Sequence, residues 1–306
     1  MSTQPTWVAV ICCATIALGC RKTPVLPTWM GAGADAAAGE LPPRSAGCAT
    51  RGEPAEPTKT RSFHVQVAGK DRAFSVQVPP SDRGHAPWPV VFFFHGRRPM
   101  DRISLPSVAV TGGLAELPSL AAHAIFVAPH GQPFMKDRVY GWDQSCGGTD
   151  MQFFDAMLES LMSSFCIDPR AVFAAGHSWG ADMVEALACC RGDKIRAISA
   201  SSGSDIAANP TCAGTKLPAF HLSFGTRDSA YRPSDFEAAV SFFRKVHGCS
   251  ELTDPLENPR CKSHRGCAQP VITCAYPGLP HRQAPDYAET AWTFFSRFLA
   301  PAAPAR

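Results

Sequence analysis

Two patterns of apolar side chains follow one another along the chain, beginning at about residue 61. Residues 63–67 and 73–78 alternate apolar and polar side chains on either side of Gly69-Lys70-Asp71, which predicts a β-hairpin with one face in water. Residues 89–94 and 124–128 are uninterrupted apolar runs, as is typical of strands covered on both faces. The change of pattern predicts an antiparallel start followed by a buried parallel sheet.

Helical spacing alternates with later apolar runs. Residues 151–165 place their large apolar side chains on one face of a helix. Further strands are expected at residues 171–175, 195–200, 219–224 and 271–275, and further helices at 181–188, 234–247 and 285–299. This order predicts an α/β fold with a mostly parallel central sheet, helices on both faces and an antiparallel N-terminal hairpin.

The stretch Gly176-His177-Ser178-Trp179-Gly180 joins one of these strands to a helix. It matches the G-x-S-x-G pattern of a nucleophile elbow, in the strand–turn–helix setting that this motif requires. The glycines let the chain turn sharply, so that the Ser178 hydroxyl projects above the sheet and the helix amides face developing negative charge. We expect Ser178 to be a catalytic nucleophile; an ordinary βα turn that contains a serine is the alternative.

Such a nucleophile needs an acid and then a histidine later in the chain. Asp228 and His281 both lie on loops that directly follow predicted strands. We expect His281 to take and return the Ser178 proton, and Asp228 to hold the imidazole tautomer. Asp205 and Asp235 are competing acids, but neither follows a strand with the same Gly-x-x-Asp turn. The order of all these parts predicts the α/β-hydrolase fold.

Backbone amides near the nucleophile are expected to form an oxyanion hole. Trp179 directly follows Ser178, and Arg97 lies just beyond an earlier apolar run, so their N–H groups are the predicted donors. Trp142, Trp179 and Tyr231 are the candidates for binding substrate by stacking on an aromatic group or a sugar. Burial against the core is the alternative for these rings.

Composition limits the number of domains and the kind of partner. The 306 residues, 45% of them hydrophobic, suffice for one α/β domain with a preceding tail. The net charge of +3 is too small to indicate nucleic acid as a partner. We expect a leader at residues 1–20, a flexible tether rich in Pro, Gly and Ala at residues 21–60, and the catalytic domain at residues 61–300.

The N-terminal residues favour export. The apolar run at residues 7–19 is too short to span a bilayer and suits a signal peptide, although no positive charge precedes it. Ala17-Leu18-Gly19-Cys20 is similar to a bacterial lipoprotein cleavage box. We therefore expect a lipoprotein of the bacterial cell envelope, anchored at a lipidated Cys20, with a simply secreted protein as the alternative.

The 13 cysteines, none of them in a C-x-x-C pair, indicate disulfides rather than a zinc site. Cys48 is a candidate for fastening the tether to the body, with no partner that the sequence identifies. A second group lies between the acid and the histidine, where cross-links are expected to stiffen a loop; it comprises Cys249, Cys261, Cys267 and Cys274. Two further pairings are considered, Cys146 with Cys166, and Cys189 or Cys190 with Cys212, and the connectivity stays open.

Several motifs together carry a family resemblance. Val91-Phe92-Phe93-Phe94-His95-Gly96, residues 166–178, Phe224-Gly225-Thr226-Arg227-Asp228 and residues 248–281 resemble the secreted polyhydroxybutyrate depolymerase and feruloyl esterase family. The resemblance implies an α/β-hydrolase that cleaves hydroxyalkanoate oligomers, or aromatic and acetyl esters on plant polysaccharide, without a metal or an organic cofactor. The chain departs from the family at Arg97-Arg98-Pro99 and Arg282-Gln283, which leaves the substrate open.

Two other functions are compatible with parts of the sequence. A peptidase of the prolyl-oligopeptidase kind would share the fold, but we find no acidic pair to recognise an amine. A surface lipoprotein that binds polysaccharide or polymer without catalysis would not need Ser178, Asp228 and His281 together. The sequence therefore favours a serine esterase; its oligomeric state is open.

Overall fold

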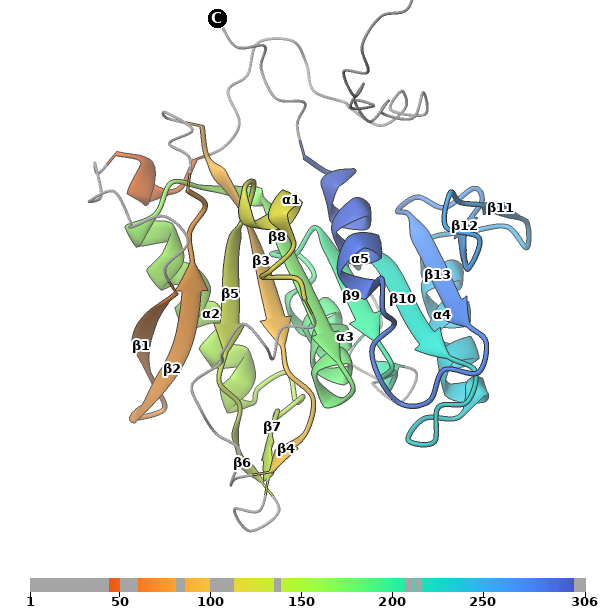
Figure 1. Cartoon of the computed structure of the whole chain (residues 1–306). Coiled ribbons are helices and arrows are strands. Elements are labelled where there is room, and N and C mark those ends of the chain that lie inside the picture. Colours follow the sequence, from red (N-terminus) through yellow and green to blue (C-terminus); the bar gives the residue numbers. More distant parts are fainter. Residues whose placement is uncertain are drawn as a thin grey trace, which may run out of the picture. The chain divides into compact units, whose positions relative to one another are not determined.

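A large twisted sheet forms the centre of the protein in the computed structural model, which describes residues 44–49, 60–80, 86–99, 113–134, 139–206, 212 and 216–299. Its ten strands follow the order β1-β2-β5-β3-β8-β9-β10-β13-β12-β11 (Figure 1). The predicted leader and most of the predicted tether lie outside the described residues. All described residues belong to one compact unit.

The strands in the middle of the sheet are parallel, and those at both edges are antiparallel. The parallel set is β5 (Ile125–Pro129), β3 (Trp88–Phe94), β8 (Ile167–His177), β9 (Ala197–Ser201), β10 (Ala219–Gly225) and β13 (Val271–Tyr276). The N-terminal hairpin consists of β1 (Arg61–Val67) and β2 (Lys70–Gln77), with β2 antiparallel to β5. The predicted mostly parallel sheet with an antiparallel start is thus confirmed.

Helices cover both faces of this sheet, so the protein has two apolar cores. Along β3, Val90, Phe92 and Phe94 face one core, while Val91 and Phe93 face the other, because successive side chains of a strand point to opposite faces. Residues of α2 (Thr149–Ser164), α3 (Trp179–Arg191) and α4 (Pro233–Val246) line the first core. Residues of α1 (Pro118–Ala121) and α5 (Tyr287–Ser296) line the second (Figure 1). The uninterrupted apolar runs of the sequence are explained by this double coverage.

Several short strands were not predicted from the sequence. A hairpin of β11 (Thr253–Pro255) and β12 (Cys261–His264) extends the sheet where a loop was expected. A small second sheet contains β4 (Arg98–Pro99), β7 (Val139–Gly141) and β6 (Gln132–Phe134). These strands are two to four residues long, too short for an apolar period to appear.

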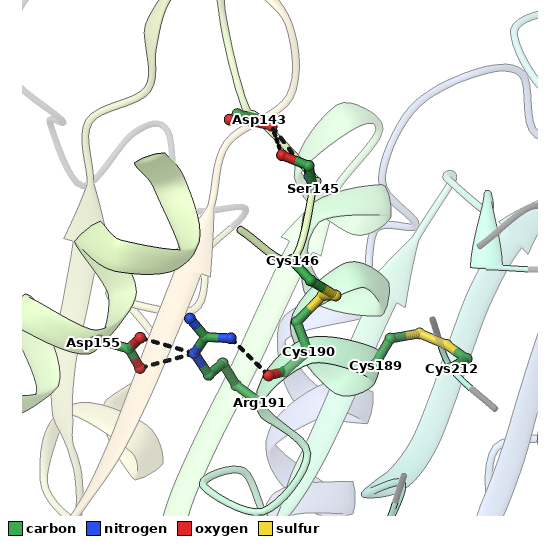
Figure 2. Close-up of a disulfide and its surroundings, with 8 residues drawn as sticks. All are labelled: Asp143, Ser145, Cys146, Asp155, Cys189, Cys190, Arg191 and Cys212. Carbon is green, nitrogen blue, oxygen red and sulfur yellow. Dashed lines mark hydrogen bonds and ion pairs between the residues drawn. A yellow bond between two sulfur atoms is a disulfide. The ribbon is translucent and has the colours of Figure 1, made fainter. Parts of the chain in front are cut away.

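All ten cysteines among the described residues form disulfides. The pairs are Cys48–Cys166, Cys146–Cys190, Cys189–Cys212, Cys249–Cys267 and Cys261–Cys274. The last two cross-link the loop between the acid and the histidine, as expected. Cys189 and Cys190 are neighbours on α3 and point in different directions, so each reaches a different partner (Figure 2). The first pair fastens the segment at residues 44–49 to the body.

The pairing of Cys146 with Cys166, one of those considered from the sequence, does not form. The two cysteines stand at opposite ends of α2, whose 16 residues separate them by about 24 Å. A disulfide needs its two Cα atoms within about 7 Å. Helical periodicity alone was therefore enough to exclude this pair.

Among the described residues, no helix is long and apolar enough to cross a membrane. The helices pack against the sheet, and α3 is buried on all sides from Gly180 to Cys189.

Candidate active site

Ser178 stands at the sharp junction between β8 and α3. Its backbone has φ 55° and ψ −126°, a conformation that L-residues rarely adopt. A Cβ at position 176 would overlap the carbonyl of Gly180, and a Cβ at position 180 would overlap the carbonyl of Phe94. Only glycine fits at both positions, which explains the spacing of the motif. The strained turn lifts the Ser178 side chain to the carboxyl edge of the parallel strands.

Three predicted side chains meet at this edge. The Oγ of Ser178 lies 2.9 Å from Nε2 of His281, and Nδ1 of His281 lies 2.9 and 3.0 Å from the carboxylate oxygens of Asp228. Because a carboxylate only accepts hydrogen bonds, Nδ1 carries the proton and Nε2 is free to accept from the Ser178 hydroxyl. The arrangement is that of a nucleophile, a base and an orienting acid.

The loops that carry the acid and the histidine are bonded to each other. Asp228 follows β10 and His281 follows β13, two strands that pair in parallel. The amide of Arg227 donates to the carbonyl of Leu279 at 3.1 Å, and the amide of Gly278 donates to Oγ1 of Thr226 at 2.9 Å. These bonds fix the acid loop against the histidine loop before any substrate binds.

Asp228 is held by its own loop as well. Its Oδ1 accepts the amides of Ala230 at 2.8 Å and Tyr231 at 3.0 Å, and its side chain is 1% exposed. The competing acid Asp235 instead caps α4, where it bonds to the amide and side chain of Arg232. Its place in the fold therefore removes Asp235 as an alternative orienting acid.

The loop after β3 passes beside the nucleophile. A Cβ at Gly96 would lie 3.1 Å from the Ser178 Cβ. Because Arg97 directly follows Gly96, its amide belongs to the segment that passes close to Ser178. Trp179 is the first residue of α3, and the first amides of a helix have no acceptor within that helix. The amides expected to form the oxyanion hole, those of Arg97 and Trp179, thus belong to the two segments that border Ser178.

His95 supports this loop in a neutral state. Its Nδ1–H donates to the carbonyl of Gly96 at 2.7 Å, and its Nε2 accepts the amide of Gly131 at 3.1 Å. Burial lowers the pKa of His95 to about 4. A neutral imidazole fixed at both nitrogens is a structural element of the loop.

The expected contact of Trp142 with substrate is wrong. The ring is 1% exposed, packs edge-on against Phe94, and donates its indole N–H to the carbonyl of His95 at 2.7 Å. A ring that is fully enclosed by the core offers no face to a ligand. Trp142 supports the loop after β3 from the side of the core, through its hydrogen bond to the carbonyl of His95.

The other two predicted aromatic residues are partly exposed near Ser178. Trp179 packs against the ring of Phe134, with centroids 5.2 Å apart. The ring of Tyr231 lies 5.7 Å from that of His281, and its hydroxyl donates to Asp182 at 2.6 Å. Their placement beside the site leaves substrate contact as a prediction for both.

Two buried carboxylates near the site, Asp182 and Glu185, received no functional prediction from the sequence. Asp182 and Glu185 are buried on α3, 8% and 1% exposed. His177 donates from Nδ1 to the carbonyl of Ser201 at 3.1 Å and stacks on His281, with ring centroids 5.4 Å apart. Burial, and then the neighbouring His281, lower the pKa of His177 to about 4. The sequence feature that could have identified Asp182 and Glu185 is a pair of carboxylates three positions apart in an otherwise apolar helix.

Within the described part of the chain, no cluster of three or more His, Cys, Asp or Glu side chains is suited to hold a metal ion. The groups that the site itself presents are the Ser178 hydroxyl, the His281 imidazole and the Asp228 carboxylate.

Solved structures with the same architecture define the class of protein. An acetyl xylan esterase from Aspergillus awamori superposes with a TM-score of 0.61 at 16% identity, covering 78% of this chain and 99% of that one. A ferulic acid esterase superposes with a TM-score of 0.55 at 15% identity, covering 79% and 99%. The protein has the α/β-hydrolase fold.

Sequence relatives define the family within that class. No family model matches the chain. It is 28% identical over 255 residues to feruloyl esterase D of Neurospora crassa, covering 76% of this chain and 84% of the relative. It is 30% identical over 258 residues to probable feruloyl esterase C of Aspergillus niger, covering 78% and 88%. The chain belongs to the feruloyl esterase family and is a carboxylic ester hydrolase.

Proposed function

We propose that the protein is an exported serine esterase that cleaves carboxylic esters through an acyl-enzyme. Ser178 is the nucleophile, His281 the general base and acid, and Asp228 the orienting carboxylate. The observation that carries this proposal is the continuous chain of hydrogen bonds from Asp228 through His281 to Ser178 at the carboxyl edge of the sheet.

Acylation uses the free lone pair of His281 Nε2. The Ser178 oxygen attacks the ester carbonyl carbon while its proton passes to Nε2. The carbonyl oxygen becomes an oxyanion, which the amides of Trp179 and Arg97 stabilise. When the tetrahedral intermediate collapses, the bond to the alcohol breaks and the alcohol leaves with the proton from Nε2.

Deacylation repeats these steps with water. His281 takes a proton from the water molecule, whose oxygen attacks the acyl carbon, and then returns the proton to Ser178 as the acid is released. Asp228 stabilises the imidazolium in both halves of the cycle, because both of its oxygens lie within 3.0 Å of Nδ1. The enzyme is thereby regenerated without a cofactor.

The names of the relatives support aromatic acyl esters as substrates, with acetyl esters beside them. Trp179 and Phe134 form a pair of aromatic rings next to the nucleophile, and such rings stack on a phenolic acyl group. Hydroxyalkanoate oligomers are the second candidate class, because the resemblance in sequence covers both. We therefore propose feruloyl or acetyl esters of polysaccharide as the substrates, and hydroxybutyrate oligomers as the alternative.

Hydrolysis of matched substrates separates these classes. The purified protein is assayed with methyl ferulate, p-nitrophenyl acetate, hydroxybutyrate oligomers and a peptide p-nitroanilide, and kcat/KM is compared. We expect methyl ferulate to be cleaved and the oligomers not. Preferential release of hydroxybutyrate would transfer the proposal to the depolymerase branch, and cleavage of a peptide bond alone would favour the peptidase. A folded protein that cleaves none of them would favour a non-catalytic polymer-binding lipoprotein.

We also propose a leader at residues 1–20, a tether at residues 21–60 and lipidation of Cys20 in the bacterial cell envelope. The five disulfides support an oxidising compartment. The remaining cysteines, Cys12, Cys13 and Cys20, all lie in the proposed leader or at its end. Mass spectrometry of the mature N-terminal peptide tests this: a diacylglyceryl group on Cys20 is expected, and an unmodified peptide that begins elsewhere would contradict it.

A further inference from the structure

Tyr231 contacts two members of the proposed catalytic set, Asp228 and His281. Its amide donates to Asp228 at 3.0 Å, and its ring lies 5.7 Å from that of His281. A residue in this position is able to affect substrate binding, the geometry of the catalytic set, or both.

The far end of the Tyr231 side chain is anchored. Its hydroxyl donates to Oδ2 of Asp182 at 2.6 Å, a short hydrogen bond. Asp182 lies on the first turn of α3, the helix that begins directly after Ser178. The bond therefore joins the loop of Asp228 to the helix of the nucleophile, two segments that the sequence separates by about 50 residues.

Asp182 occupies an unusual environment for a carboxylate. It is 8% exposed, and it faces the Tyr231 hydroxyl, the Ser204 amide, Glu185 and the more exposed Asp205. Among the described residues, no cation pairs with it. Burial raises the pKa of Asp182 to about 7.

Glu185, one turn further along α3, performs a similar function on another loop. Its Oε2 accepts the amides of Asp205 at 2.9 Å and Ile206 at 3.0 Å. Burial raises the pKa of Glu185 well above its usual value, so this carboxyl holds its proton more strongly than an exposed one. Buried carboxyls without a cation are unfavourable for folding, and they persist where they hold something in place.

We propose that Asp182 is a positioning residue that acts through the Tyr231 hydroxyl on the set Asp228–His281–Ser178. The bond from Tyr231 to Asp182 holds the acid loop at a fixed distance from the nucleophile helix, so that both nitrogens of His281 stay within reach of their partners. This inference rests on the proposed function, because it assigns a role in the same reaction.

The direction of the Tyr231 hydrogen bond also matters for the nucleophile. A phenol hydroxyl has one proton, and here it is donated to Asp182. The Tyr231 hydroxyl therefore has no proton left to donate to Ser178 Oγ, whose own proton is directed to His281 Nε2. A proton donated to Ser178 Oγ would withdraw electron density from the attacking atom, and the bond to Asp182 prevents this.

The test uses Tyr231→Phe, Asp182→Ala, Asp182→Asn and the double variant Tyr231→Phe/Asp182→Ala in the full-length protein. We measure kcat and KM separately on p-nitrophenyl butyrate, and the rate at which a fluorophosphonate labels Ser178. Tyr231→Phe and Asp182→Ala are each expected to lower kcat and the labelling rate about 10-fold, with KM within about two-fold, since each variant breaks a short hydrogen bond to a buried carboxyl. Asp182→Asn keeps an acceptor and should recover most of the rate.

If both residues act through one bond, the double variant should be no slower than the slower single variant. Tyr140→Phe is the matched control, a partly buried tyrosine in β7 with no role in the proposed bond, and it should keep the wild-type rates. Circular dichroism and thermal unfolding verify the fold of each variant. If Asp182→Ala fails to fold, the two single variants Tyr231→Phe and Asp182→Asn are compared instead.

Two patterns of altered kinetics would overturn the inference, as would unchanged kinetics in all the variants. One is a rise in KM with unchanged kcat and labelling rate, which would make Tyr231 a substrate contact. The other is a set of independent losses that multiply in the double variant. An active wild type with unaffected variants refutes this inference alone, whereas a wild type without esterase activity refutes the proposed function itself.

Discussion

The Cys48–Cys166 disulfide closes a longer loop than any other disulfide in the described part of the chain. Its cysteines are 118 positions apart, whereas those of Cys261–Cys274 are 13 apart. Replacing both members of a pair by serine removes the cross-link without leaving a free thiol. The native contacts of the N-terminal segment remain, since Ser45 still bonds to the carbonyl of Phe165 at 2.7 Å.

The loop lengths give the expected magnitudes. The chain-entropy relation predicts a loss of about 5 kcal/mol for the long loop and about 3 kcal/mol for the short one. For a domain of this size, about 1 kcal/mol shifts Tm by roughly 2 °C or somewhat more. The Cys48→Ser/Cys166→Ser protein should therefore melt at least about 10 °C below wild type, and the Cys261→Ser/Cys274→Ser protein about 6 °C below it.

Guanidinium unfolding followed by tryptophan fluorescence measures both losses without reductant. The difference of about 2 kcal/mol between the two double variants is the decisive quantity, because it depends on loop length alone in this account. Equal losses, or a larger loss for the short loop, would refute the entropic reasoning. Esterase activity of both variants at low temperature verifies that the site is intact.

Two further predictions concern the site and the core. Asp228→Asn should lower kcat by about three to four orders of magnitude, because the amide no longer fixes the His281 tautomer; a loss below about 10-fold in steady-state kinetics would contradict the assigned role. His221 is fully buried, and burial lowers its pKa to about 3, so it is neutral when folded and protonates when unfolded below about pH 6.5. Protonation of His221 in the unfolded chain should therefore lower the free energy of unfolding by about 3 kcal/mol as the pH falls from 6.5 to 4. His221→Gln should flatten this dependence in urea unfolding, and an unchanged slope would show that His221 does not cause it.

The sequence was sufficient to predict the parts of the fold that repeat a simple pattern. The β3 and β5 runs are apolar throughout because both faces of the sheet are covered, and this pattern is visible without coordinates. Ser178, Asp228 and His281 were found because each must follow a strand at the same edge of the sheet. Their mutual distances came only with the structure.

Features that depend on packing could not be predicted in the same way. Tryptophan is a residue type that often stacks on ligands. Only the buried position of the Trp142 ring, with its N–H bonded to the carbonyl of His95, excludes that role. The bond between Tyr231 and Asp182 joins segments that are remote in sequence, so no local pattern announces it. The pairing of Cys146 with Cys166 could have been excluded, because the length of α2 already separates them.

Ser178 is proposed as the nucleophile of an esterase. The most direct measurement compares the hydrolysis of p-nitrophenyl butyrate and methyl ferulate by the wild-type protein and by Ser178→Ala, with equal folding verified by circular dichroism. The account predicts turnover of both esters by the wild type and loss of at least about three orders of magnitude in Ser178→Ala. Turnover by Ser178→Ala at the wild-type rate would contradict it.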